Sequence, residues 1–140
     1  MLVPAPATIA GLAKASGVDV ESICTFHRLG LLPKPRRRQG RYGDVAYHRE
    51  HLERLTFIRR AQKLGFLLDA IGEMLGLAGG LTTCADVYRI AKRHLAEVRA
   101  RARPDEIRRL ERVLVPLLDA SPQSGLANDS PIIIMLSYSP

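Results

Sequence analysis

The sequence predicts a mainly α-helical chain, in which a winged helix-turn-helix precedes one long helix and a short C-terminal loop. Three features support this fold class: two short helical patterns joined by a glycine turn, a basic stretch rich in Pro and Gly, and a sustained apolar repeat in the second half. The 140 residues suffice for one compact domain, or for a small domain with a helical extension. Hydrophobic residues are 46% and charged residues 25%, which argues against a wholly disordered chain.

The first 30 residues predict two short helices joined by a tight turn. Thr8 is a good N-cap for a helix that continues to Ala15, and residues 16–19 form the glycine-containing turn. A second helix follows from about Val20 to Leu29, where the next residue is a glycine that ends it. This is the helix-turn-helix arrangement, although an ordinary helical hairpin fits the same lengths.

Residues 33–47 predict a short basic β-hairpin, which we call the wing. Prolines and glycines break any helix in this stretch. The side chains that favour strands are Tyr42, Val45 and Tyr47. A helix returns from roughly Arg49 to Lys63, a short helix follows Gly65, and residues 78–80 indicate a hinge-like break.

The segment from Cys84 to about Asp119 predicts a single long helix, because apolar residues recur at steps of three and four over five heptads. So small a body cannot cover this stripe, so we expect the helix to pair with the same helix of a second chain. Pro104 should kink or break the helix at 103–105, since proline lacks a donor and clashes with the turn before it. The tail after Ser121 is expected to be loop-like, with a brief apolar strand or turn at 132–136.

The positive charge is concentrated in one half of the chain. The formal net charge is +7, and residues 1–63 hold 12 Lys and Arg against 5 Asp and Glu, whereas residues 64–140 hold 9 of each kind. A basic patch on one small module is typical of a nucleic-acid binder, although a solvated surface is the simpler alternative. No catalytic set, phosphate-binding glycine loop or dinucleotide fingerprint is present, so we expect no enzyme.

The sequence also predicts the cellular compartment of the protein. Apolar runs are too short for a transmembrane helix, so no membrane partner is expected. The N-terminus lacks a basic region followed by an apolar stretch, so we expect no secretory signal. Two cysteines, Cys24 and Cys84, make a disulfide framework improbable and favour a reducing cytoplasm.

Three stretches resemble the MerR family of transcription regulators. They are the opening helix and turn at residues 8–18, the Gly-Leu-Leu-Pro sequence at 30–33, and the stretch at 55–66 that opens the next helical pair. The likeness covers roughly residues 7–136. Residues 62–71 and the helix that begins at Cys84 are similar to the mercury-responsive branch of that family.

The resemblance implies a division into three parts. These are a winged helix-turn-helix DNA-binding domain at 1–76, a hinge and dimerisation helix forming an antiparallel coiled coil at 77–120, and an effector-binding loop and tail at 121–140. Such a homodimer binds an inverted repeat in promoter DNA, and metal binding untwists that DNA so that RNA polymerase can engage it. A protein-interaction module that no longer reads DNA, and a sensor of another metal or of a small molecule, remain alternatives.

The resemblance also assigns DNA-contacting residues. In the second helix they are Ser22, Thr25, Phe26 and Arg28, and in the wing they are Arg37, Arg38, Arg41 and Tyr42. The chain departs from the family at Cys24 and Val45, where basic residues are usual, so we expect weaker or differently directed binding.

No cofactor is certain, although the resemblance implies an Hg(II) ion held by three thiolates. Cys84 stands at the first thiolate position, whereas Ser121 and Ser130 stand at the other two. Serine oxygen is hard and stays protonated near neutral pH, so we expect an impaired metal site. The simpler alternative is that Cys84 is only a small residue at a helix start. The pairs Cys24/His27 and His48/His51 have spacings that could hold a metal, but each offers only two ligands.

Overall fold

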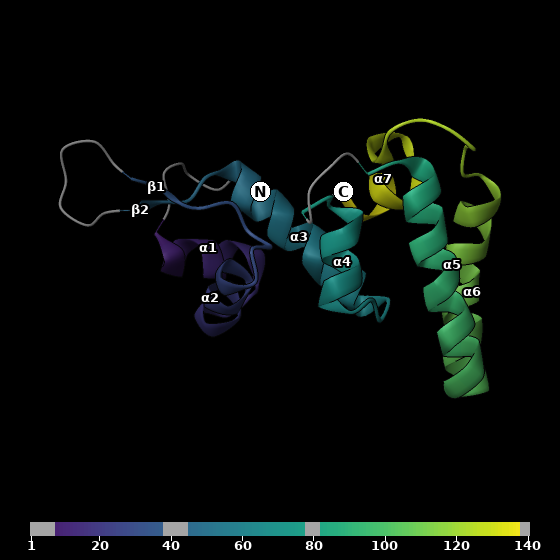
Figure 1. Cartoon of the computed structure of the whole chain (residues 1–140). Helices are drawn as coiled ribbons and strands as arrows, with labels where there is room; N and C mark the ends of the chain where they lie inside the picture. The colour runs from purple at the N-terminus through teal and green to yellow at the C-terminus, as the bar shows by residue number, and fades with distance from the viewer. Residues whose placement is uncertain (1–7, 38–44, 78–81, 138–140) are drawn as a thin grey trace. The chain divides into compact units, whose positions relative to one another are not determined.

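The computed structural model describes residues 8–37, 45–77 and 82–137. Its contacts divide the chain into two units between Arg59 and Arg60, and each unit is described by itself. The predicted mainly helical class is confirmed (Figure 1). The elements in chain order are α1 (Ile9–Ser16), α2 (Val20–Arg28), β1 (Arg36–Arg37), β2 (Val45–Ala46), α3 (Arg49–Lys63), α4 (Leu68–Met74), α5 (Cys84–Arg101), α6 (Pro104–Asp119), the 3-10 helix η1 (Ala127–Asp129) and α7 (Pro131–Ser137). The boundaries expected at residues 76 and 120 stay predictions.

Helices α1 and α2 of the first unit form the predicted helix-turn-helix. The Thr8 hydroxyl accepts a hydrogen bond from the Gly11 N–H at 3.1 Å, and the Asp19 carboxylate accepts one from the Ser22 N–H at 2.8 Å. These side chains satisfy amide groups that would otherwise lack partners at a helix start. The core of the unit is formed by the buried side chains of Leu12, Ile23, Phe26, Leu55 and Ile58.

Gly17 closes the turn between α1 and α2 in a conformation that other residues rarely adopt. Its φ is +72°, and an added Cβ would lie 2.7 Å from Nη1 of Arg59, which donates to the Ser16 carbonyl at 3.0 Å. Gly30 has a similar φ of +75° but open space around it. A side chain at either position would strain the backbone, but only a side chain at Gly17 would also collide with Arg59.

We expect Gly17→Ala to lower the free energy of unfolding by about 1–3 kcal/mol, because strain and displacement of the Arg59 guanidinium add. Gly30→Ala carries the strain alone and should cost about 1 kcal/mol. Urea unfolding followed by circular dichroism measures both. Equal losses in the two variants would contradict a role for the Arg59 contact.

The wing is confirmed as a pair of short antiparallel strands. Arg36 pairs with Ala46 and Arg37 pairs with Val45 in the register of β1 and β2. Residues 38–44, which connect the two strands, lie outside the described residues.

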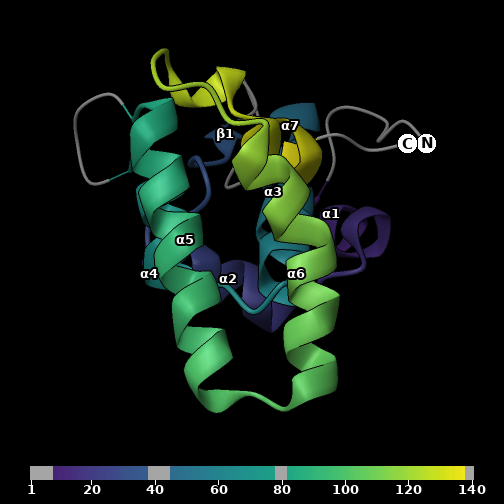
Figure 2. The same cartoon turned by 90° about the vertical axis from the view of Figure 1, so that its right-hand side faces the viewer.

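The second unit corrects the prediction of one long helix. Helix α5 ends at Arg101, Ala102 and Arg103 have extended backbone with ψ of 169° and 152°, and Pro104 begins α6 at its first turn. The expected break near 103–105 is therefore confirmed, whereas the single helix is wrong. Helix α6 runs back alongside α5 as an antiparallel hairpin (Figures 1 and 2). Proline suits the first turn of a new helix because the amide it lacks would be unpaired there.

The hairpin buries much of the apolar stripe within its own chain. The buried residues on the two helices are Cys84, Val87, Ile90, Ala91, Leu95, Leu110 and Leu114. An ion pair of 2.7 Å between Arg99 and Glu111 ties α5 to α6. Other apolar residues of the stripe, such as Val98, Ile107 and Leu117, are only half-buried in the single chain, and the homodimer stays a prediction.

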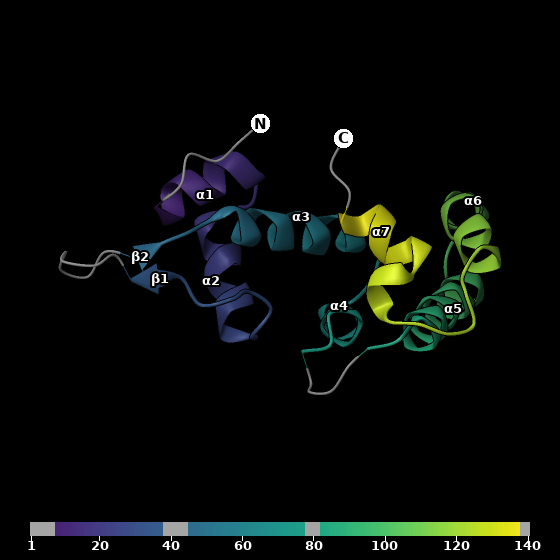
Figure 3. The same ribbon diagram turned by 90° about the horizontal axis from the view of Figure 1, so that it is seen from above.

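The tail also differs from its prediction, since residues 131–137 form helix α7 and not a strand or turn (Figure 3). The Ser130 hydroxyl accepts from the Ile132 N–H at 3.2 Å, and its carbonyl accepts from the Ile134 N–H at 3.0 Å. Ile132, Ile133 and Leu136 are buried, at the spacing of one helix face. Within the described part of the chain, no helix is long and apolar enough to cross a membrane.

Candidate nucleic-acid interface and metal position

Helix α2 presents a polar surface built around Thr25 and Arg28. The Thr25 hydroxyl accepts from a guanidinium nitrogen of Arg28 at 3.1 Å and donates to the Glu21 carbonyl at 3.1 Å. Arg28 is exposed, and Ser22 is half-buried near the helix start. Hydrogen bonds from Ser22 lower the pKa of Asp19, so the carboxylate that caps α2 stays ionised.

Phe26 does not belong to this surface. Only 6% of it is exposed, and it is part of the core of the first unit. The expectation that Phe26 enters the major groove is therefore corrected, because a ring buried in the core cannot reach base edges. The spacing from Ile23 to Phe26 is the signal that could have revealed its burial, since residues three apart share a helix face.

The predicted DNA contacts in the wing are placed only in part. Arg37 lies on β1, opposite Val45. Arg38, Arg41 and Tyr42 lie outside the described residues. Their contacts with DNA stay predictions.

Two arginines on α3 position the helix-turn-helix, and sequence reasoning missed both. Arg54 donates to the Leu31 carbonyl at 2.9 Å and so holds the chain that leaves α2. Burial lowers the pKa of Arg54, and the charge of Glu50 opposes that shift. Arg59 holds the end of α1 through the Ser16 carbonyl. The sequence shows that Arg54 and Arg59 lie on a helix with an apolar stripe. It does not show that either side chain donates to a backbone carbonyl.

His27 of α2 forms a cluster with Tyr47 and His51. His27 Nε2 is 3.1 Å from the Tyr47 hydroxyl, and the Tyr47 and His51 rings meet edge to face with centroids 5.1 Å apart. Burial raises the pKa of Tyr47, with a smaller contribution from Cys24. The His27–Tyr47 contact ties the end of the wing to α2.

The two-residue metal pairs find no support in this geometry. His51 Nδ1 accepts from the His48 N–H at 2.9 Å, and its Nε2 lies 3.4 Å from the Lys34 carbonyl. His51 therefore helps to begin α3, and both ring nitrogens have protein partners. No group of three or more His, Cys, Asp or Glu residues that could hold a metal occurs in the described ranges.

We expect His27 to make the stability of the first unit depend on pH. Burial lowers the pKa of His27 below its ordinary value of about 6.5, and His51 lowers it further. Between the folded and unfolded pKa values the unfolded chain binds more protons, so stability rises with pH through this window. Acidifying from pH 8 to pH 5 should therefore lower the urea midpoint, and His27→Gln, which cannot titrate, should reduce this loss. An identical pH dependence in both proteins would contradict the assignment.

Cys84 lies at the start of α5, beneath the loop that precedes η1. The Thr83 hydroxyl accepts from the Asp86 N–H at 3.1 Å and the Asp86 carboxylate accepts from the Thr83 N–H at 3.0 Å, which fixes this helix start. The Cys84 thiol is fully buried and donates to the Leu126 carbonyl at 3.1 Å. Its backbone N–H donates to the Gly125 carbonyl at 3.0 Å.

The two serines make other bonds. The Ser121 hydroxyl donates to the Leu117 carbonyl at 2.8 Å, and the buried Ser130 hydroxyl accepts from the Ile132 N–H. Ser121 is therefore bonded to the last turn of α6, and Ser130 is bonded to the first turn of α7. Neither bond involves Cys84.

The helix-turn-helix with its paired strands defines the chain as a winged DNA-binding protein. Residues 7–77 match the family described as MerR HTH family regulatory protein, and residues 52–117 match MerR, DNA binding. The chain belongs to the MerR family of transcription regulators, as its sequence predicted, and is not an enzyme.

Relatives of known identity are similar over most of this chain. The mercuric resistance operon regulatory protein of Serratia marcescens is 40% identical over 116 residues, which are 81% of this chain and 75% of the relative. The protein of the same name from Bacillus cereus is 32% identical over 126 residues, 89% of this chain and 92% of the relative. The chain is also similar to the crystal structure of the transcription regulator PbrR691 from Ralstonia metallidurans CH34 in complex with lead(II). The two sequences are 32% identical, and the match has a TM-score of 0.59 and covers 87% of this chain and 97% of that one.

Proposed function

We propose that the chain acts as a homodimer on an inverted-repeat operator in promoter DNA, with a metal response weaker than that of its mercury-responsive relatives. The observation that supports DNA reading best is the polar surface of α2, where the exposed Arg28 bonds the half-buried Thr25 hydroxyl on a capped helix. Recognition helices of this class read the edges of bases in the major groove.

Two sets of residues divide the work of binding. Ser22, Thr25 and Arg28 contact bases, since hydroxyl and guanidinium groups form the hydrogen bonds that specify sequence. Arg37, Arg38, Arg41 and Tyr42 contact the phosphate backbone from the wing, which requires charge more than fixed geometry. Cys24 offers no charge on α2, so a larger share of the affinity comes from the wing.

The homodimer follows from the symmetry of an inverted repeat, because each helix-turn-helix reads one half-site. Exposed apolar side chains in the second unit support it: Leu126 is 50% exposed and Ile134 is 52% exposed. The partners are therefore promoter DNA, a second copy of the chain and, as in the family, RNA polymerase in the cytoplasm.

The donor set around Cys84 supports an impaired metal response. Hg(II) is a soft ion that prefers thiolate sulfur, whereas this chain offers one buried thiol bonded to a carbonyl and two serine hydroxyls bonded elsewhere. These residues do not fit a three-thiolate site. We therefore assign the chain no resident metal.

Fluorescence anisotropy of a labelled inverted-repeat promoter fragment tests the proposal, with salt varied and Hg(II) present or absent. We expect binding that prefers the inverted repeat, weakens steeply with salt and changes little with the metal. A clear response to Hg(II) would overturn the impaired site, because Cys84 would then have found other ligands. The absence of any preference for the inverted repeat would overturn DNA reading and favour the protein-interaction module.

A further inference from the structure

The exposed side of α2 carries an acid, Glu21, that is not among the proposed DNA contacts. Ile23 and Phe26 are buried, so the opposite side of the helix faces solvent. Since successive residues turn by about 100° around a helix, Glu21 and Arg28 lie nearest the centre of that side, and both are exposed. An acid in this place repels phosphates and should weaken DNA binding, unless it meets a specific donor.

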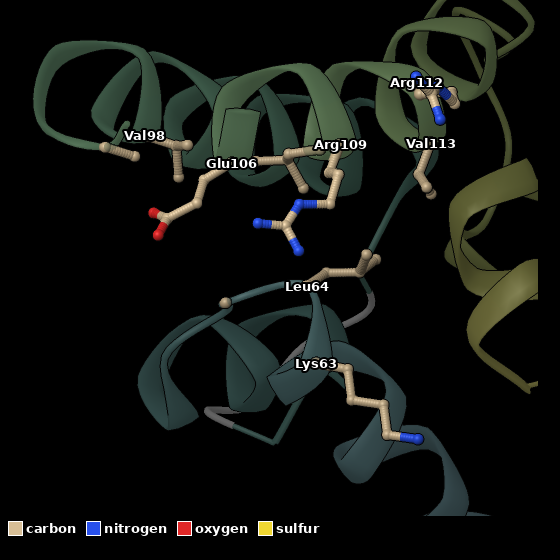
Figure 4. A pocket seen from close by; sticks show the side chains of 10 residues that line it. Lys63, Leu64, Val98, Glu106, Arg109, Arg112 and Val113 are labelled. Carbon is tan, nitrogen blue, oxygen red and sulfur yellow. The ribbon is translucent and has the colours of Figure 1, made fainter. Parts of the chain in front are cut away.

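The Glu21 carboxylate is free to accept a hydrogen bond. Other acids of the chain have partners: Asp19 caps α2, and Figure 4 shows the Glu106 carboxylate beside the Arg109 guanidinium. Among the residues that the structure describes, no hydrogen bond or ion pair holds the side chain of Glu21. Only its backbone carbonyl is used, accepting from the Thr25 hydroxyl at 3.1 Å. A new partner for the carboxylate therefore displaces no existing interaction.

The position of Glu21 along α2 suits contact with a base. The N-terminal residues of a recognition helix reach base edges in the major groove, and Glu21 is the second residue of α2, whereas Arg28 is the last. Their backbones lie about 10 Å apart along the helix axis. Base pairs are stacked about 3.4 Å apart, so the carboxylate and the guanidinium face different base pairs.

We propose that Glu21 determines operator specificity by accepting a hydrogen bond from the N4 amino group of a cytosine. The inference rests on the proposed reading of DNA by α2. A carboxylate only accepts hydrogen bonds, and cytosine presents a donor in the major groove. Guanine and thymine present acceptors there, so Glu21 also disfavours these bases by placing two acceptors together. Adenine presents a donor beside an acceptor, which an amide matches better than a carboxylate.

A purely structural role for Glu21 makes a different prediction. An acid in the first turn of a helix stabilises that helix through its dipole. On that account, variants of Glu21 would lose stability and keep the same base preference. Urea unfolding of each variant, measured beside its DNA binding, separates the two roles.

The test is selection of bound sequences from a duplex library in which both half-sites of an inverted repeat are randomised. We expect the full chain to select cytosine at one position of each half-site. Anisotropy on matched duplexes should show that Glu21→Ala lowers this preference about tenfold. Glu21→Gln should shift the preference to adenine, because an amide pairs with its N6 and N7 atoms. Both variants should bind non-cognate duplex more tightly, about twofold or more, since a charge that repels phosphate is removed.

Glu53→Gln is the matched control, because Glu53 is an exposed acid of the same unit that pairs with Arg49 on α3. It removes the same charge and should leave the base preference unchanged. Glu21→Gln keeps the shape of the side chain, so it reports the preference even if Glu21→Ala unfolds. The same selected sequence in the unmodified chain and in Glu21→Gln would overturn this inference and leave the proposed reading of DNA intact, as would an equal shift in Glu53→Gln. If the unmodified chain selects no sequence at all, both proposals fail.

Discussion

Replacing Arg37 and Arg38 by glutamate is expected to lower operator affinity by about 100-fold or more and to flatten its salt dependence. Each phosphate that a basic side chain neutralises releases counterions, and contributes about 0.9 to the slope of log affinity against log salt. Loss of two contacts should therefore reduce that slope by about two. Arg37 is held in register by its pairing with Val45, so the change alters the wing's charge at a fixed strand position.

The effect must be separated from the change in net charge. Arg101 and Arg103 flank the break between α5 and α6, are both exposed, and lie outside the helix-turn-helix unit. Replacing this pair by glutamate changes the net charge equally and should alter affinity far less. Anisotropy at several salt concentrations distinguishes the two variants, and the idea of a phosphate-binding wing fails if both slopes fall together.

The helix-turn-helix was predictable because its signals are local. Thr8 and Asp19 cap their own helices, and Gly17 and Gly30 adopt the positive φ that ends a helix. Each signal depends on neighbours within four residues, so a single sequence contains it. The wing was found in the same way, from breakers on both sides of strand-forming residues.

The hairpin was not predictable, because the apolar period is the same on both sides of Pro104. A repeat of three and four residues fits one helix paired with another chain as well as two helices that fold together. The choice depends on long-range contacts such as Arg99–Glu111, which no local pattern encodes. Phe26 shows a different limit: family position assigned it to DNA, whereas its spacing from Ile23 placed it in the core.

The second large effect concerns the metal response, which two substitutions should restore. Ser121→Cys with Ser130→Cys supplies three thiols together with Cys84, and should raise Hg(II) affinity by about two orders of magnitude or more. The physical reason is that thiolate sulfur is soft and charged at the pH where serine stays neutral. Hg(II)–thiolate absorption, measured against increasing concentrations of a competing small thiol, reports the retained metal.

The control must keep the number of thiols while moving one of them. Ser124 is exposed in the same loop, so Ser124→Cys with Ser130→Cys adds two thiols with only one at a family position. This control should lose Hg(II) to the competitor at concentrations that the first variant withstands. Adding Cys84→Ser to the first variant should remove the gain as well, because the third sulfur is then absent. If the Ser124→Cys control retains Hg(II) as firmly as the first variant, the number of thiols and not their position governs binding, and the serines at 121 and 130 are not what weakens the metal response of this chain.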